Sequence, residues 1–229
     1  MEDYRRFAIY WAPEAGPLAS FAAAWLGWDP AEGQDVAHPE VPGLPAPVEA
    51  LTEAPRKYGF HGTLKAPFRL VEGATQDGLR AALAAFAART APVTLDGLRL
   101  TRLDRFLALL PEGEEAPLTR LAGEIVEAFE PFRAPLSPED MLRRQADALP
   151  PRQRDLLGRY GYPYVMEEFR FHLTLTGPLE PQEAEAAHAA LAPAIAPLLP
   201  RPFRIAAICL FGEAADGRFH NLHRYALTG

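Results

Sequence analysis

The sequence has little of several features that mark particular classes of protein. Cys209 is the only cysteine among 229 residues, so the chain can form neither an internal disulfide nor a metal site built from clustered cysteines. Lysine and arginine together number 23 against 30 Asp and Glu, which leaves a net charge of −7. No overall positive field is therefore available to attract a long nucleic acid.

Long hydrophobic runs are also missing. The N-terminal stretch MEDYRRFAIYWAP begins with charged residues, and its apolar run is too short for a signal sequence. No segment reaches the roughly 20 apolar residues that span a bilayer. These absences and the single cysteine predict a cytoplasmic protein without a membrane partner.

What the chain does contain is an alternation of strand-like and helix-like segments. Short runs of aromatic and β-branched residues end at Pro or Gly, and apolar residues at helical spacing lie between them. We expect strands at 5–13, 60–70, 93–111 (two strands), 171–179 and 203–227 (two strands), helices at 16–28, 75–90, 116–132 and 181–199, and an irregular loop at 29–57.

The order of these segments occurs twice. RFAIYWAPEAGPL (6–18) runs alongside RFLALLPEGEEAPL (105–118), and each passes from a strand through an acidic, Pro-containing turn into a helix. The sequence therefore predicts an internally duplicated, two-lobed α+β fold with antiparallel sheets, outer helices and a central groove. We expect a single domain over 1–229, with repeats at about 5–104 and 105–227.

Residues 136–168 interrupt the second repeat. Ser137, Pro138 and Glu139 are typical of a helix start, and Pro150-Pro151 divides the segment into two helices. The segment is too short for a core of its own, so we expect an inserted helical arm.

Two His-x-Thr tripeptides occupy equivalent places in the repeats, in YGFHGTLKAPF (58–68) and FRFHLTLTGPL (169–179). Residues i and i+2 of a strand point to the same side. His61 and Thr63 should therefore project together, as should His172 and Thr174. A twofold relation between the repeats would bring both pairs into one groove.

Two facing imidazoles suit the cleavage of a phosphodiester. One can remove a proton from the attacking oxygen while the other protonates the leaving oxygen, and threonine hydroxyls and cations can stabilise the phosphate charge. Lys65, four residues after His61, and Arg170, two before His172, are expected to share the two faces and bind phosphate. This chemistry requires no metal.

The paired motifs in a duplicated α+β chain resemble the 2H phosphoesterase superfamily, which includes the 2'-5' RNA ligase-like cyclic phosphodiesterases. RKYGFHGTLKAPF and RYGYPYVMEEFRFHLTLTGPL are most similar to a DUF1045-like bacterial branch linked to phosphonate metabolism, and the resemblance spans essentially the whole chain. The resemblance implies a metal-independent hydrolase without a cofactor, with His61 and His172 catalytic and Thr63 and Thr174 binding phosphate.

The same resemblance implies a substrate. A small anionic cyclic phosphate, 5-phosphoribosyl 1,2-cyclic phosphate, fits phosphonate utilisation, and association with other enzymes of that pathway is expected. An acidic chain with a few local cations fits such a sugar better than a long nucleic acid.

Further residues are candidates for substrate binding. Tyr58, Tyr162 and Tyr164 flank the motifs and could stack on a base or sugar. Arg218, His220 and Arg224 are expected to share one face of the last strand beside the groove, although an exposed charged face explains them equally well. His220 and His223 lie three apart, on opposite faces of a strand, so no metal site is expected there.

Three other interpretations stay open. The protein could be a nucleotide- or RNA-binding module of the same fold without turnover, an RNA 2',3'-cyclic phosphodiesterase, or a scaffold for other pathway enzymes, for which the helical arm is the only support. A bell-shaped pH–rate profile that survives chelation would distinguish an enzyme from a binding module.

Overall fold

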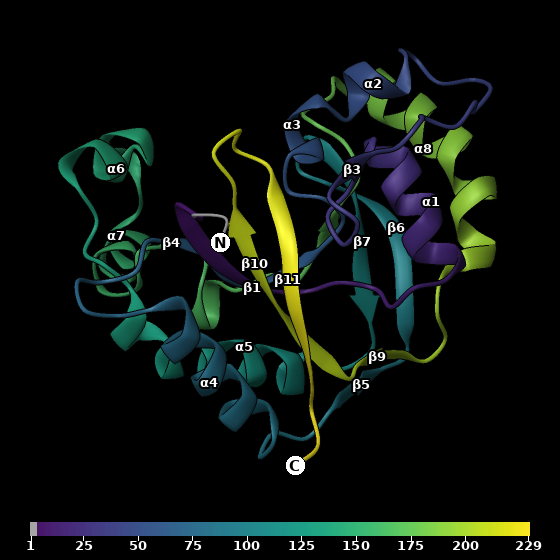
Figure 1. Ribbon diagram of the computed structural model, residues 1–229. Helices are drawn as coiled ribbons and strands as arrows, with labels where there is room; N and C mark the ends of the chain where they lie inside the picture. The colour runs from purple at the N-terminus through teal and green to yellow at the C-terminus, as the bar shows by residue number, and fades with distance from the viewer. Residues whose placement is uncertain (1–3) are drawn as a thin grey trace.

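One antiparallel sheet runs through the computed structural model, which describes residues 4–229 apart from the Arg143 side chain (Figure 1). Residues 1–3 of the predicted domain lie outside the described part. Seven strands of the described residues form the sheet, in the spatial order β11-β10-β1-β4-β8-β7-β6. Their bounds are β1 (Arg6–Trp11), β4 (Gly62–Phe68), β6 (Gly97–Leu103), β7 (Phe106–Glu112), β8 (Leu173–Thr174), β10 (Ala207–Glu213) and β11 (Phe219–Ala226).

The strand order reveals the duplication. On either side of the central β4–β8 pair, β1 corresponds to β7 and β10 corresponds to β6. A second small ladder joins β5 (Val93–Leu95) to β9 (Phe203–Ile205), which are again equivalent segments of the two repeats. Ladders between equivalent strands are what a twofold axis through the centre produces. The predicted duplicated antiparallel α+β fold is confirmed.

Each half of the sheet combines both repeats. The last strand of the first repeat, β6, pairs with β7, and β10 of the second repeat pairs with β1. We infer that the repeats meet at the turn between β6 and β7, close to the predicted boundary of 104 and 105, and that neither lobe can form from one repeat alone.

Four longer helices cover the core face of the sheet. Their apolar residues join one cluster with alternate residues of the strands, among them Ile9 and Leu64. The helix α5 contacts β4, α4 contacts β10 and β11, and α8 contacts β6 and β7. Across residues 4–229, every helix is too short or too polar to span a bilayer. The bounds are α1 (Pro17–Leu26), α4 (Gln76–Ala87), α5 (Ala116–Ala128) and α8 (Pro181–Ile195).

The opposite face of the sheet carries a smaller aromatic cluster. Tyr10 packs there with Phe211 and Phe219, and Cys209 is buried beside them. Because β1 is central and covered on both faces, its sequence is an almost continuous apolar run. The candidate site lies on this second face.

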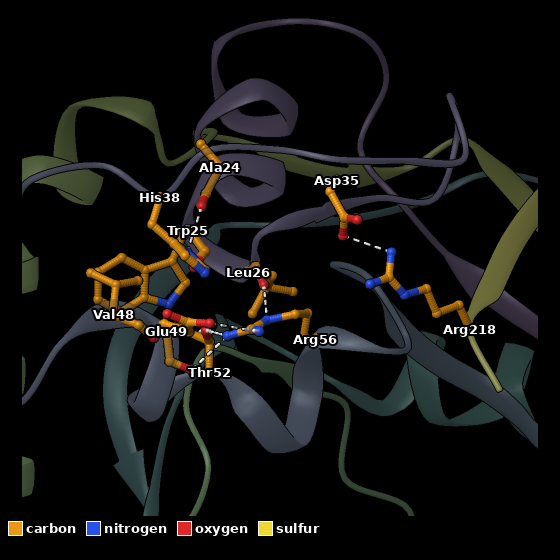
Figure 2. Close-up of polar contacts among 10 residues, drawn as sticks. All are labelled: Ala24, Trp25, Leu26, Asp35, His38, Val48, Glu49, Thr52, Arg56 and Arg218. Atoms are coloured by element: carbon orange, nitrogen blue, oxygen red, sulfur yellow. Dashed lines mark hydrogen bonds and ion pairs between the residues drawn. The ribbon is translucent and has the colours of Figure 1, made fainter. Parts of the chain in front are cut away.

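The segment predicted as an irregular loop, 29–57, contains short ordered elements, which Arg56 ties together. Its guanidinium donates to the carbonyl oxygen of Leu26 at 3.1 Å, to that of Glu49 at 2.5 Å and to Thr52 Oγ1 at 3.3 Å (Figure 2). These bonds fix the chain just before Lys57. The elements are β2 (Trp28–Asp29), β3 (Gln34–Asp35), α2 (Val48–Leu51) and α3 (Glu53–Arg56).

The inserted arm is present as predicted, with α6 (Pro138–Arg143) and α7 (Pro151–Tyr160). Ser137 and Asp140 form a capping box at the start of α6. Asp140 also forms an ion pair with Arg69, which directly follows β4, at 2.5 Å. The hydrogen bond from Arg69 holds the pKa of Asp140 well below its ordinary value. The arm is thus attached to the end of the first His-x-Thr strand.

Beyond Thr174 the chain leaves the regular ladder, so β8 is shorter than the strand predicted at 171–179. The amide groups of Leu175 and Thr176 both donate to the carbonyl oxygen of Leu107, and the Thr176 hydroxyl accepts from the Leu107 amide. This local irregularity replaces normal strand pairing. Four 3-10 segments complete the described elements, at Glu130–Phe132, Ala146–Ala148, Met166–Glu168 and Ala196–Leu198.

Candidate active site

The two His-x-Thr motifs meet at the centre of the sheet. Gly62 of β4 pairs with Leu173 of β8, so the flanking pairs His61/Thr63 and His172/Thr174 surround one point on the same face. Because the strands are antiparallel, each histidine lies across from the threonine of the other motif. The structure therefore brings the four predicted residues together.

Both histidines are oriented by the same hydrogen bond. Nδ1 of His61 lies 2.9 Å from the carbonyl oxygen of Gly59, and Nδ1 of His172 lies 2.8 Å from that of Arg170. A carbonyl oxygen can only accept, so Nδ1 carries the proton in both rings. Nε2 of each neutral imidazole is then the nitrogen that can accept a proton from substrate or water.

Two adjoining hollows form a groove over these residues. The first, of roughly 530 Å³, is lined by His61, Thr63 and Thr174. The second, of roughly 430 Å³, is lined by His172. Thr63, Ala66, Phe106 and Tyr162 line both hollows. This shared wall makes them one continuous site, large enough for a small ligand.

The surroundings of the two histidines differ. Tyr10 stacks on His61 with 3.9 Å between ring centroids, and Tyr58 lies at 5.9 Å. In the second repeat Ala108 pairs with Thr174 as Tyr10 pairs with Thr63, so the stacking ring is replaced by a methyl group. His172 instead contacts the ring of Phe106 at 5.7 Å. The duplicated site is therefore chemically asymmetric.

This asymmetry affects the acidity of the two rings. Burial, helped by the nearby His172 when that ring is charged, lowers the pKa of His61 to about 4 against the raising effect of the Gly59 carbonyl. Burial also lowers the pKa of His172. Of the pair, His172 takes up a proton first, and its charge then opposes protonation of His61.

The two threonine hydroxyls face the groove. Among the described residues, neither Thr63 nor Thr174 has a side-chain hydrogen bond, and both line the first hollow. Thr176 also lines it, but its hydroxyl already accepts from the Leu107 amide and donates to the Gly177 carbonyl. Of the threonines that line the first hollow, Thr63 and Thr174 are therefore the two whose hydroxyls are available to a phosphate oxygen.

The prediction for Lys65 is wrong. Tyr10 pairs with Thr63, but the preceding residue of β1, Ile9, pairs with Lys65 and not with Leu64, so a bulge shifts the register between the two pairs. The bulge turns Lys65 to the core face. Its side chain is only 3% exposed there, and Nζ donates to Glu130 Oε2 at 2.9 Å and to the Val126 carbonyl at 3.0 Å. Lys65 cannot reach a phosphate in the groove.

Other predicted residues do line the groove. Arg170 lies beside His172 in the second hollow. Tyr58 lines the first hollow, Tyr164 the second, and Tyr162 both. The tyrosines at the end of the inserted arm thus form a wall of the site.

Arg218, His220 and Arg224 lie outside the groove, contrary to prediction. Arg218 pairs with Asp35 at 2.6 Å (Figure 2), and His220 contacts the ring of Trp28. Arg224 donates to the carbonyl oxygens of Ala12 and Pro13.

A second bulge explains the faces of β11. Phe211 of β10 pairs with Asn221, whereas Leu210 pairs with His223, so Leu222 is the extra residue. The bulge separates His220 and Arg224 onto opposite faces and places His220 and His223 on the same face. The predicted separation of those two histidines is therefore also wrong. Even so, no group of three or more His, Cys, Asp or Glu side chains within 4–229 is arranged to hold a metal ion.

Several groove residues escaped the sequence analysis: Arg6, Tyr10, Lys57, Phe106 and Arg144. Lys57 had a usable signal, because it stands four residues before His61 in RKYGFH. Arg6 and Tyr10 belong to a strand whose neighbour in the sheet was unknown. Arg144 lies at the end of α6, and nothing in its local sequence indicates that the arm reaches the site.

The fold and the paired motifs define a duplicated antiparallel α+β architecture, with two inward-facing histidines at the centre of the sheet. Residues 63–220 match the model of the family described as "Protein of unknown function (DUF1045)". This match covers more than half of the chain, and the chain belongs to that family.

Two curated relatives are named "Ribose 1,5-bisphosphate phosphokinase PhnN". The protein from Janthinobacterium sp. (strain Marseille) is 40% identical over 186 residues, 80% of this chain and 41% of the relative. The protein from Laribacter hongkongensis (strain HLHK9) is 36% identical over 176 residues, 76% of this chain and 40% of the relative. The chain thus spans about two fifths of the length of the curated relatives it matches.

Solved structures show a more distant similarity. Escherichia coli LigT in apo form is 19% identical, with a TM-score of 0.43 and 99% of each chain covered. TT0787 of Thermus thermophilus is 16% identical, with a TM-score of 0.42 and 98% of each chain covered. At such scores, the assignment of the fold depends on the duplicated topology and the paired motifs.

Proposed function

We propose that the protein is a metal-independent phosphodiesterase that opens a small cyclic phosphodiester, with His61 and His172 as its catalytic residues. The observation that carries this proposal is the repeated bond from Nδ1 to the carbonyl two residues earlier. It gives both imidazoles the same tautomer and directs both Nε2 atoms to one groove.

The reaction uses the two rings in opposite senses. Nε2 of His61 removes a proton from water, and the water oxygen forms a bond to phosphorus. The bond from phosphorus to the leaving ring oxygen breaks, and protonated His172 donates its proton to that oxygen. The product is a phosphate monoester with a free hydroxyl. To return the site to its starting state, His61 needs only to lose a proton and His172 to gain one.

The environments support this assignment of roles. His61 is held neutral at neutral pH by its buried, ring-stacked position, as a general base must be. His172 takes up a proton first of the pair and suits the acid role. The Thr63 and Thr174 hydroxyls donate to the non-bridging oxygens as negative charge develops on them.

The substrate we propose is 5-phosphoribosyl 1,2-cyclic phosphate. The names of both curated relatives include ribose 1,5-bisphosphate, a ribose carrying two phosphate groups. A groove of this size fits one sugar. We further propose a cytoplasmic role beside other enzymes of phosphonate utilisation, with no resident metal or cofactor.

The kinase activity in those names is not transferred to this chain. A nucleotide-binding P-loop has the pattern GxxxxGK[ST], and the only lysines here, Lys57 and Lys65, follow Arg56 and Leu64. This region of the relatives therefore needs a function of its own, and the groove supports a phosphodiesterase.

Phosphorus NMR of the purified protein in EDTA tests the proposal. The samples contain either 5-phosphoribosyl 1,2-cyclic phosphate or nucleoside 2',3'-cyclic phosphates. We expect the cyclic resonance to convert to a monoester. His61→Ala or His172→Ala should slow the conversion by at least about 100-fold, and Thr63→Val or Thr174→Val by about 10- to 100-fold.

A matched control and two alternative outcomes complete the experiment. Thr94→Val, at an exposed site on β5 far from the motif, should retain full activity. Faster opening of the nucleotides would favour an RNA 2',3'-cyclic phosphodiesterase. Line broadening without any product would favour the binding module and overturn the proposed activity.

A further inference from the structure

The first hollow is unusual for so acidic a chain. None of the described residues that line it is Asp or Glu, although these residues outnumber Lys and Arg in the sequence. Three cations, Arg6, Lys57 and Arg144, contribute to its wall. The second hollow, by contrast, is lined by Asp104 and Glu168 as well as Arg170. Positive charge is therefore concentrated at the His61 end of the groove.

Each of the three cations lies against an aromatic ring. Lys57 Nζ lies 5.0 Å from the ring centroid of Tyr58, and Arg144 Cζ lies 5.4 Å from that of Tyr162. Such contacts hold a cation beside the ring face. Both tyrosines line the same hollow, so the rings place the two charges at its rim.

Arg6, the third cation, has both an aromatic ring and a carboxylate beside it. Arg6 lies 5.9 Å from the ring of Phe219, and its guanidinium forms a two-point ion pair with Glu213, at 2.5 and 2.6 Å. The Glu213 carboxylate offsets most of its charge. Arg6 is therefore a supporting cation of the hollow, beside Lys57 and Arg144.

These cations are separate from the reaction centre but close to it. The Tyr58 ring is near both groups: Lys57 Nζ lies 5.0 Å from its centroid and the His61 ring lies 5.9 Å from it. One aromatic ring is thus shared by the ammonium group and the catalytic ring. A sugar bound with one phosphorus between the histidines would extend a second substituent towards Lys57 and Arg144.

We propose that Lys57 and Arg144, supported by Arg6, form a second anion subsite that binds a phosphate monoester on the substrate away from the reacting phosphodiester. This inference deepens the proposed function and rests on it for the orientation of the sugar. It assigns the substrate class: a small sugar that carries both a cyclic phosphodiester and a separate monoester. Lysine and arginine are the usual ligands of such a dianion.

The subsite also gives the inserted arm a role. Arg144 directly follows α6, and Tyr162 follows α7, so half of the subsite comes from the arm and half from the chain after α3. Selection of a doubly phosphorylated substrate is then a property of the segment that interrupts the second repeat.

Binding of ribose 5-phosphate, measured by titration calorimetry, tests the subsite independently of turnover. This probe carries the monoester but no cyclic phosphodiester. We expect Lys57→Ala and Arg144→Ala each to weaken binding by about tenfold, the usual effect of losing a hydrogen bond between charged groups. Arg120→Ala, which removes an exposed arginine on α5 away from the groove, is the matched control and should bind like the unaltered protein.

Kinetics on paired substrates supply the second measurement. Ribose 1,2-cyclic phosphate is compared with its 5-phosphorylated form, and adenosine 2',3'-cyclic phosphate with its 5'-phosphorylated form. We expect the unaltered protein to prefer the monoester-bearing member of each pair in kcat/KM, and each variant to reduce that preference about tenfold.

The two measurements separate the two proposals. If no cyclic compound is opened but ribose 5-phosphate binds and depends on Lys57 and Arg144, the phosphodiesterase fails and the subsite stands. If the cyclic compounds are opened without preference and the variants bind ribose 5-phosphate normally, the subsite is overturned and the phosphodiesterase stands. Circular dichroism confirms that each variant is folded.

Discussion

At the scale of single residues, identical side chains acquire different properties from their surroundings. His61 and His172 share a motif, a tautomer and a carbonyl partner. Tyr10 beside His61 corresponds to Ala108 in the other repeat, and this difference helps to make one imidazole harder to protonate. Duplication supplied two equal groups, and the neighbouring strands made them unequal, as the proposed roles of base and acid require.

The pKa of His61 makes stability depend on pH. Its pKa is about 4 in the folded protein against an ordinary value of 6.5, so between these values the unfolded chain binds a proton that the folded chain does not. Stability therefore falls as the pH falls below 6.5, and the loss from this group is complete below about pH 4.

Urea unfolding at pH 7 and pH 5 measures this effect. Between pH 7 and pH 5, we expect the free energy of unfolding of the unaltered protein to fall by about 2 kcal/mol more than that of His61→Gln. The variant has no group to protonate at this position. Equal losses in the two proteins would show that His61 titrates normally in the folded state.

At the scale of elements, β4 serves both the core and the site. Its first residues place Thr63 over the groove, and the bulge after Thr63 turns Lys65 towards α5. Gly62, between His61 and Thr63, has no side chain, and the ring of Phe171 fills the space beside it. A Cβ at position 62 would overlap Cζ of that ring. This contact explains why the first motif has glycine where the second has Leu173.

Gly62→Ala should therefore destabilise the protein by about 2–3 kcal/mol, because the buried ring must move to admit the methyl group. Urea unfolding of this variant is compared with Gly158→Ala. Gly158 lies in α7, and a methyl group added there would meet nothing within 4 Å, so alanine should stabilise slightly through its higher helix propensity. A Gly62→Ala protein as stable as the parent would contradict the close packing against Phe171.

The ion pair behind β4 gives another prediction at this scale. Glu130→Gln leaves the ammonium group of Lys65 buried without its carboxylate, and Arg133, which also pairs with Glu130, loses the same partner. We expect the free energy of unfolding of Glu130→Gln, measured in urea, to be about 3 kcal/mol lower than that of the unaltered protein. Glu124→Gln makes the same chemical change at an exposed position of α5 and should have little effect. Similar stabilities for the two variants would mean that the buried pair contributes nothing.

At the scale of the whole molecule, the exchange of β6 and β10 between the two halves of the sheet unites the repeats. Since β6 and β10 each complete the half of the sheet that belongs to the other repeat, the groove can form only when both repeats are folded. The acidic charge of the chain is likewise not uniform, because the cations gather at one end of the groove. A small anion is attracted locally, while the rest of the surface repels an extended polyanion.

This charge distribution predicts a preference for small substrates. A long RNA ending in a 2',3'-cyclic phosphate should be opened more slowly, in kcat/KM, than a mononucleotide with the same terminal group, because its remaining phosphates meet an acidic surface. Chromatographic detection of the opened ends in both substrates, at one salt concentration, measures the ratio of the two kcat/KM values. Faster opening of the long RNA would indicate a nucleic-acid track outside the groove.

The sequence by itself determined the strand and helix alternation, the duplication, the inserted arm and the four residues His61, Thr63, His172 and Thr174. These features are local, because hydrophobic period, turn residues and motif spacing are written along the chain. They were enough to indicate the fold and the chemistry of the candidate site.

Only the tertiary structure decided which other polar residues belong to the groove. The faces of Lys65 and Arg224 depend on bulges, and a bulge forms through pairing with a neighbouring strand that is distant in sequence. Arg6, Lys57 and Arg144 come from three separate segments that meet only when the sheet, the α3 turn and the arm are assembled. The sequence of a strand predicts that successive side chains alternate between the two faces of the sheet. Pairing with the partner strand determines where a bulge interrupts that alternation.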